Sequence, residues 1–147
     1  MEVKIKKLYA DSILPTKAHA TDAGYDLYAH NLMRDNQANL VYTTGVAMEI
    51  PQGYVGLVFP RSSISRKDLI LTNCVGVIDS GYRGEISFKF KRVNFAEQQE
   101  DLLENEYIKD ERIGQIIIMP YPEIEFVEVE ELSDSERGDG GYGSSGK

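Results

Sequence analysis

The sequence predicts an all-β protein, a barrel or sandwich of short strands in a single domain. Apolar and β-branched residues occur in short runs, some of them alternating, and glycine or proline turns separate the runs. No helical segments alternate with the strands, so the pattern does not support a parallel sheet. At 147 residues and 16.5 kDa, the chain is long enough to bury a sizeable core.

Six segments have the pattern of strands. The first alternates in hydropathy, and the second is a β-rich run that ends at Pro51-Gln52-Gly53. A short apolar run and another alternating run follow, and Pro120 and Pro122 separate the last two segments. The expected strands span residues 3–9, 40–50, 54–59, 85–90, 113–119 and 124–129.

Helical structure is expected only in short pieces. Ser62 and Ser63 follow a strand, and their hydroxyls suit the cap of a short helix. The acidic stretch 96–106 is interpreted as a surface insertion of one or two helical turns. From Ser133 onward the residues are small and polar. We therefore expect a folded domain over residues 1–132 and a flexible glycine-rich arm over residues 133–147.

Charge and composition exclude several classes of protein. The formal net charge of −8 argues against general binding to nucleic acid or an anionic membrane. No apolar run approaches the ~20 residues of a membrane span, and the N-terminus lacks the apolar core of a signal peptide. The single cysteine, Cys74, excludes an internal disulfide and is expected to be buried. These features predict a cytoplasmic protein, in which a polyanionic ligand needs a local basic pocket and a bridging cation.

The C-terminal segment RGDGGYGSSG, residues 137–146, has the groups that bind a phosphate. Arg137 offers a guanidinium fork, Ser144 and Ser145 offer hydroxyls, and the glycine N–H groups are free to turn inward. The ring of Tyr142 can lie on a base. The alternative interpretation is a disordered Gly/Ser tail.

Three internal segments carry further polar groups. Asp26 follows a glycine turn, and its carboxylate suits a hydrated Mg²⁺, although plain turn chemistry is the alternative. PRSS, with Arg61, presents N–H groups and hydroxyls to an anion, or is an ordinary capped turn. Asp79 follows an apolar strand and is expected to be partly buried, where one carboxylate can orient a water for phosphate-ester hydrolysis. A hairpin turn is the alternative for Asp79.

In this order, the segments closely resemble the trimeric dUTPases, the deoxyuridine triphosphate nucleotidohydrolases. The resemblance spans the chain and rests on five motifs: AGYDLYA at 23–29, PRSS at 60–63, NCVGVIDSGYRG at 73–84, RIGQ at 112–115 and RGDGGYGSSG. It implies a jelly-roll-like β-barrel that forms a homotrimer with exchanged C-terminal arms and active sites at subunit interfaces. The implied reaction is Mg²⁺-assisted attack of water on the α-phosphorus of dUTP, which gives dUMP and pyrophosphate. Such an enzyme keeps uracil out of DNA and supplies dUMP for thymidylate synthesis.

The resemblance also implies roles for residues around the nucleoside and the metal. Asp79 corresponds to the aspartate that activates the attacking water, and Asp26 to the one that holds Mg²⁺ through water. Tyr82 corresponds to the tyrosine that packs under the deoxyribose and leaves no room for a 2′-hydroxyl. The residues implied to bind uracil are Asn73, the hairpin residues Gly76, Val77 and Ile78, and the stacking Tyr142, which stands where phenylalanine is common.

The same resemblance implies that two groups of residues bind the phosphates. The body of the protein contributes the turn Arg61, Ser62 and Ser63, together with Gln115. The arm contributes residues that grip the γ-phosphate, namely Arg137, Gly143, Ser144 and Ser145.

Other functions remain open at this point. A dCTP deaminase shares the fold and the phosphate logic but needs an acid/base glutamate in place of the chemistry of Asp79. A regulatory protein is a second alternative, with the acidic stretch 94–111 as its contact with a protein partner, as in some phage-encoded members. For a phage-encoded chain the expected location is the host cytoplasm. A purely structural β-trimer is the third alternative.

The two histidines, His19 and His30, match no catalytic motif and are expected to be solvated.

Overall fold

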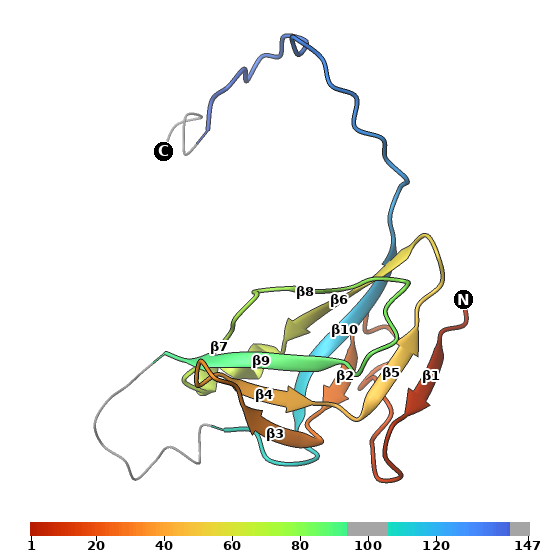
Figure 1. The fold of residues 1–147 in the computed structure, drawn as a ribbon, viewed down its shortest axis with the longest axis vertical. Coiled ribbons are helices and arrows are strands. Elements are labelled where there is room, and N and C mark those ends of the chain that lie inside the picture. The colour runs from red at the N-terminus through yellow and green to blue at the C-terminus, as the bar shows by residue number, and fades with distance from the viewer. Residues whose placement is uncertain (94–105, 142–147) are drawn as a thin grey trace.

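The protein is a small barrel of short strands, shown in Figure 1 as a computed structural model that describes residues 1–93 and 106–141. One short 3-10 helix, η1 (Ser62–Arg66), interrupts the strands. The strands are β1 (Lys4–Lys7), β2 (Tyr25–Tyr28), β3 (Asn31–Arg34), β4 (Leu40–Thr43), β5 (Val46–Glu49), β6 (Tyr54–Pro60), β7 (Leu69–Leu71), β8 (Gly76–Ile78), β9 (Ser87–Arg92) and β10 (Arg112–Pro120).

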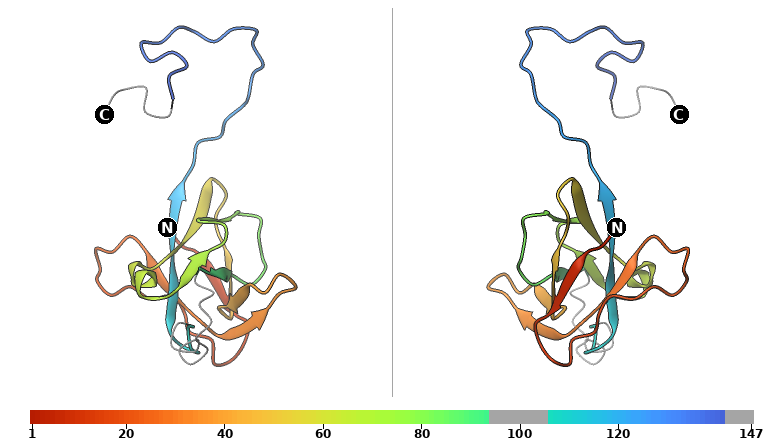
Figure 2. Two further views of the ribbon diagram at one scale, coloured as in Figure 1. Left: turned by 90° about the vertical axis from the view of Figure 1, so that its left-hand side faces the viewer. Right: turned by 90° about the vertical axis from the view of Figure 1, so that its right-hand side faces the viewer.

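Two four-stranded antiparallel sheets form the body of the molecule. Their strand orders are β2-β10-β6-β8 and β3-β4-β9-β7, and β1 pairs with β5 beside them. Figures 1 and 2 show the strands wrapping around one interior, as in a jelly roll. The all-β prediction is therefore confirmed.

Side chains from the two sheets meet in a single core. Leu27 and Ile116 come from the first sheet, and Tyr42, Phe88 and Phe90 from the second, and each is at most 1% exposed. The rings of Tyr42 and Phe90 meet edge to face at a centroid distance of 6.0 Å. This packing holds the strand ends that carry the functional residues.

The expected strand 40–50 is in fact two strands, β4 and β5, which lie in different sheets. The chain turns at Gly45, whose φ of +70° lies in the left-handed region that glycine enters without strain. A Cβ at this position would also clash with the Ser12 hydroxyl. The Gly45 N–H donates to the Glu85 carboxylate at 2.7 Å, so a contact distant in sequence stabilises the turn.

The chain leaves the barrel after β10, and the strand expected at 124–129 is not formed within this chain. Residues 121–141 run away from the body as an extended arm (Figure 2). Phe126 is 92% exposed and Leu132 88% exposed. A strand needs a partner edge for its backbone hydrogen bonds, and a chain that points away from its own sheets has none. In this single chain the barrel ends with β10 at Pro120. The boundary expected at residue 132 stays a prediction, because residues 121–132 could join a folded body only by packing on another subunit.

Two smaller expectations were wrong. Cys74 is exposed, because it occupies a tight turn with φ +58° between β7 and β8. The side chain of His30 is only 14% exposed, since it stacks on Tyr9 and lies 3.0 Å from the Asp11 carboxylate. In the described part of the chain, no helix has the length and apolar character needed to cross a membrane.

Candidate active site

The predicted phosphate turn lies at the end of β6, where the chain leaves the sheet and enters η1. Arg61 is extended at the N-terminal end of the helix, and its carbonyl accepts from the Ile64 N–H at 3.0 Å. Arg61 and Ser62 face a hollow of about 370 Å³. Asp26 and Gln115 line the same hollow, so four of the residues predicted from the sequence lie together.

Asp26 lies between two arginines in this hollow. Its Oδ1 lies 3.0 Å from Arg61 Nε in an ion pair, and its Oδ2 accepts from Arg112 Nη1 at 3.1 Å. The Asp26 side chain is 14% exposed, so both ion pairs are partly shielded from water. Asp22 lines the same hollow, so two guanidinium groups stand beside two carboxylates, and Arg61 and Arg112 offer guanidinium donors to a polyanion there.

The sequence did not identify Arg112 as a site residue, and a β-bulge explains its position. Where β10 pairs with β2, Gln115 lies opposite Asp26, but the register shifts between Arg112 and Gly114, so that Arg112 lies opposite Tyr28. The extra residue, Ile113, is completely buried. Directly opposed residues share a face of the sheet, so the bulge brings Arg112 to the face of Asp26 and Gln115. Plain alternation would place Arg112 on the other face.

A second hollow, of about 210 Å³, surrounds the predicted catalytic aspartate. Val77, Ile78, Asp79 and Tyr82 line it, together with Glu85 and Ser87. The Tyr82 N–H donates to the Asp79 carbonyl at 3.0 Å, which closes the turn between them. Asp79 is exposed, contrary to the expectation of partial burial, because it follows β8, an edge strand of its sheet.

Tyr82 is held in a defined orientation beside this turn. Its hydroxyl donates to the Glu85 carbonyl at 3.0 Å, although the residue is 44% exposed. The ring lies against Gly84, where a Cβ would clash with the tyrosine hydroxyl. The ring thus presents an exposed surface whose position is set by the backbone.

Asn73 precedes β8 in the turn that follows β7, a strand of the other sheet. The hairpin expected from the sequence is therefore not formed between β7 and β8. A Cβ on Gly76 would lie 3.3 Å from Asn73 Nδ2, so the amide stands beside the first residue of the strand. Val77 is 61% exposed, while its backbone pairs with Leu57 of β6. The turn and β8 therefore offer an amide side chain and an edge strand with one free edge in the described chain.

One chain does not bring all the predicted residues together. The two hollows have no lining residue in common. Arg137 lies on the arm, where its Nε donates to the Gly140 carbonyl at 2.9 Å. Tyr142, Gly143, Ser144 and Ser145 lie outside the described residues.

The family model described as dUTPase matches residues 10–146. The chain belongs to the dUTPase family. It is 39% identical over 150 residues to the deoxyuridine 5'-triphosphate nucleotidohydrolase of Nautilia profundicola, with 100% of both chains covered. It is 40% identical over 148 residues to the enzyme of the same name from Corynebacterium glutamicum, covering 99% of this chain and 95% of that one.

Solved dUTPase structures share the fold. The dUTPase of Staphylococcus bacteriophage 80alpha with dUPNHPP superposes with a TM-score of 0.85 at 34% identity, and 99% of each chain is covered. A mutant dUTPase from phage phi11 of S. aureus, described as coordinating a structural Mg(II) ion, has a TM-score of 0.75 at 27% identity. That match covers 90% of this chain and 99% of the other. The membership in the dUTPase family expected from the five motifs is confirmed.

Proposed function

We propose that this protein hydrolyses dUTP to dUMP and pyrophosphate. One observation carries the proposal: Arg61 and Ser62 of the phosphate turn line one hollow with Asp26 and Gln115, in a chain that belongs to the dUTPase family over nearly its whole length. By removing dUTP, the reaction would keep uracil out of DNA, and its product dUMP would feed thymidylate synthesis.

The nucleoside would bind at β8 and the turn before it. Asn73 and the backbone of Gly76, Val77 and Ile78 have donors and acceptors that suit the edge of uracil, and the exposed ring of Tyr82 suits the deoxyribose face. Asp79, exposed at the end of β8, would take a proton from the attacking water. A carboxylate in this role must contact both water and substrate, and the exposed position of Asp79 allows it to do so.

The residues present fit a magnesium ion that is held mainly by phosphates and water. The described residues contain no group of three or more His, Cys, Asp or Glu side chains arranged around a metal position. Mg²⁺ commonly binds through one or two carboxylates plus substrate phosphates and keeps several waters. Asp26 lies beside the phosphate turn and would hold the hydrated ion, which supplies charge neutralisation at the phosphates.

The ion pair between Asp26 and Arg61 can be replaced when the triphosphate binds, because a phosphate oxygen can take the place of the carboxylate as the partner of Arg61. While Arg61 is paired with Asp26, one of the carboxylate oxygens is occupied. A triphosphate oxygen can accept from the Arg61 guanidinium instead, with a bidentate geometry that suits phosphate. Asp26 Oδ1 then becomes free to accept from a water molecule, while Arg112 still holds Oδ2.

We propose that the active protein is a homotrimer that exchanges its C-terminal arms. In a single chain, the hollow at Asp79 and the hollow at Asp26 are separate. Arg137 lies on the extended arm, away from the barrel (Figure 1). Sites shared between subunits would join the three parts, as the family resemblance implies. Residues 133–147 would then close over a site of a neighbouring subunit.

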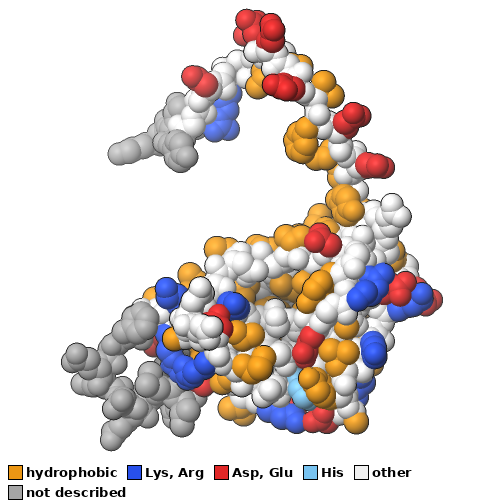
Figure 3. Space-filling model, in the orientation of Figure 1, with side chains coloured by type: hydrophobic (Ala, Val, Ile, Leu, Met, Phe, Trp, Pro, Cys, Tyr) orange, Lys and Arg blue, Asp and Glu red, His pale blue; other side chains and the backbone are white. Residues whose placement is uncertain are grey.

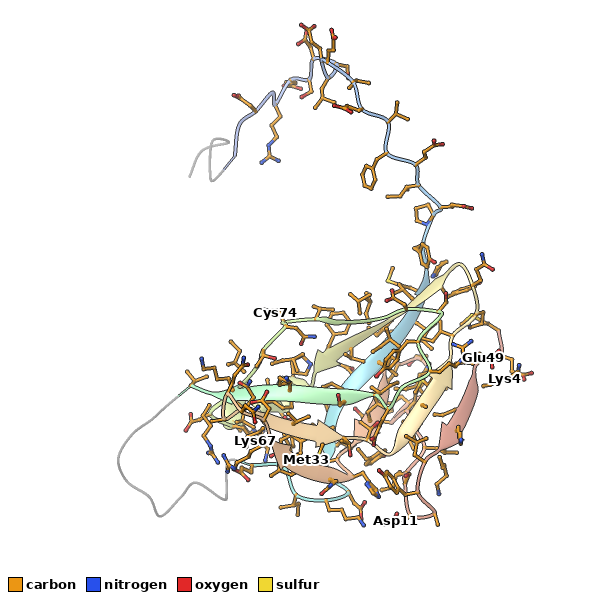
Figure 4. All side chains as sticks on the ribbon, in the orientation of Figure 1. Lys4, Asp11, Met33, Glu49, Lys67 and Cys74 are labelled. Carbon is orange, nitrogen blue, oxygen red and sulfur yellow. The ribbon has the colours of Figure 1, made fainter. Side chains whose placement is uncertain are left out.

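The surface beside β1 suits the arm of a second copy. Among the described strands β1 pairs with β5 alone, next to an apolar groove of about 450 Å³. Figure 4 shows Lys4 and Glu49 joined across this pair, with the other lysines of β1, Lys6 and Lys7, also exposed. On the arm, Figure 3 shows acidic side chains with apolar ones between them. In the part of the arm nearest the barrel, the acidic residues are Glu123, Glu125, Glu128, Glu130 and Glu131.

Phe126→Asp is therefore expected to convert the trimer into smaller species. The 92% exposed ring is the largest apolar group on the arm, and its burial would contribute about 1.5–3 kcal/mol per subunit. Light scattering after gel filtration measures the mass against the 16.5 kDa of one chain. Phe126→Leu, which keeps an apolar side chain, is the matched control, and an unchanged trimer in Phe126→Asp would contradict arm exchange.

Substrate choice tests the proposed function directly. Pyrophosphate release is expected with dUTP. UTP should react with a much lower kcat/KM, because its 2′-hydroxyl would meet the ring of Tyr82. For dCTP, kcat/KM should be lower by about 10⁴-fold, because its amino group leaves the polar groups that recognise uracil unpaired. The assay includes dATP, dGTP and dTTP. Deamination of dCTP, or no release of pyrophosphate from dUTP, would refute the assignment.

A second, regulatory function through 94–111 stays a prediction from the sequence. Residues 94–105 lie outside the described residues. Related structures of the 80alpha dUTPase are described as phage dUTPases that control transfer of virulence genes by a G protein-like mechanism.

A further inference from the structure

The phosphate turn has little anchoring of its own. η1 is five residues long, has no side-chain cap at its N-terminus and has no buried residue. Ile64 is partly buried against the core, and the Lys67 N–H closes the helix on the Ile64 carbonyl at 2.9 Å. A short exposed 3-10 helix with so few contacts needs other parts of the fold to keep its donors in place.

Lys67, at the C-terminal end of this helix, supplies such an anchor. Its side chain is only 14% exposed, and Nζ donates to the Glu106 carbonyl at 2.9 Å. The same Nζ lies 3.3 Å from the Glu111 carboxylate and 4.4 Å from the centre of the Tyr107 ring. A shielded ammonium group is stable only with such partners. All three partners lie between residues 106 and 111, immediately before Arg112.

The residues that hold Lys67 are themselves firmly held. Glu106 is 9% exposed and forms ion pairs with Arg34, at 2.9 Å, and with Arg92. Tyr107 is 3% exposed, and its N–H donates to the Tyr42 hydroxyl at 3.1 Å. The anchor of Lys67 is therefore part of the core and not a mobile loop contact.

One segment of chain thus contacts both ends of the phosphate turn. Residues 106–111 hold Lys67 at the end of the helix, and Arg112 shares Asp26 with Arg61 at its beginning. Burial raises the pKa of Tyr107 to about 12, with Glu111 adding to the rise and Arg61 opposing it. Figure 4 shows Lys67 on the side of the barrel where the described chain resumes at Glu106.

We propose that Lys67 is a positioning residue for phosphate binding: by clamping the end of η1 to residues 106–111, it keeps Arg61, Ser62 and Ser63 oriented toward the triphosphate. The proposal rests on the proposed function, since it concerns the same phosphate turn. Lys67 contacts no substrate and acts through the turn. Because coupling is reciprocal, a triphosphate bound at the turn also stabilises the clamp.

Lys67→Met tests the clamp, because it keeps the aliphatic stem over Tyr107 and removes the ammonium group. Calorimetry on the intact chain is expected to show binding of dUpNHpp weakened about tenfold, with that of dUMP, which lacks the β- and γ-phosphates, changed much less. Lys67→Arg is expected to restore part of the affinity. Hydrogen exchange of the peptide 62–67 should rise in Lys67→Met and fall again when dUpNHpp is added.

Glu111→Gln is the partner variant, and Lys91→Met, on an exposed position of β9, is the matched control. If the two clamp residues act together, the double variant with Lys67→Met loses less affinity than the two single losses combined. Unchanged dUpNHpp affinity, an equal loss for dUMP, or the same loss in Lys91→Met would overturn the proposal. Failure of the unaltered protein to bind dUpNHpp would instead refute the proposed function.

Discussion

Asp79→Asn is expected to lower kcat for dUTP by about 10²–10⁴-fold, the usual contribution of a general base. Asparagine keeps the size and the hydrogen-bonding capacity of the side chain but cannot accept a proton from water. Asp79 is exposed at the end of β8, so the change should leave the barrel stable. Binding of dUpNHpp should also be largely kept. Steady-state pyrophosphate release gives kcat, and calorimetry gives the affinity.

Asp110→Asn is a suitable control for this prediction. Asp110 is an exposed aspartate with φ +67°, a conformation that asparagine also tolerates. Its substitution is expected to leave kcat within about twofold, because it lies outside both hollows. If Asp79→Asn turned over dUTP within a few-fold of the unaltered protein, another group would have to activate the water.

Deletion of the chain after Ser135 is expected to lower kcat/KM by about 10²-fold or more, because the arm positions the triphosphate and excludes water. The deleted residues include Arg137 and the serines of the glycine-rich segment, and none of them belongs to the core. The trimer should therefore still form, with residues 123–132 present to contact a neighbouring subunit. Light scattering checks the mass, and pyrophosphate release checks the activity.

The diphosphate dUDP provides the internal control for the arm. It lacks the γ-phosphate that Arg137, Ser144 and Ser145 are predicted to bind, so truncation should weaken its binding much less than that of dUpNHpp. Calorimetry with both ligands on both proteins measures the difference. Equal losses for the two ligands, or no loss for either, would show that the arm does not recognise the γ-phosphate.

The sequence alone predicted the all-β class and the chemistry of the motifs. Alternating runs and glycine or proline turns are local signals, and they located β1, β6, β9 and β10 with errors at the ends. Arg61, Ser62 and Gln115 were identified by residue type and order, and they do line one hollow with Asp26. These inferences needed only information that neighbouring residues carry.

Short strands and chain reversals were harder to predict. β2, β3, β7 and β8 have three or four residues each, too few for a period to stand out. The break at Gly45 depends on Glu85 and Ser12, which are distant in sequence. The strand expected at 124–129 has the right local pattern but lacks an edge to pair with in its own chain.

The sequence by itself thus determined the class of fold, the family and the kinds of side chain that meet a nucleotide. Only the tertiary structure decided which of those side chains meet one another. A bulge before Gly114 brings Arg112 to Asp26. The packing of residues 106–111 against the core places the Glu106 carbonyl and the Glu111 carboxylate beside Lys67. The physical reason is that register and strand pairing are set by contacts between distant segments, and a shift of one residue moves a side chain to the opposite face of a sheet.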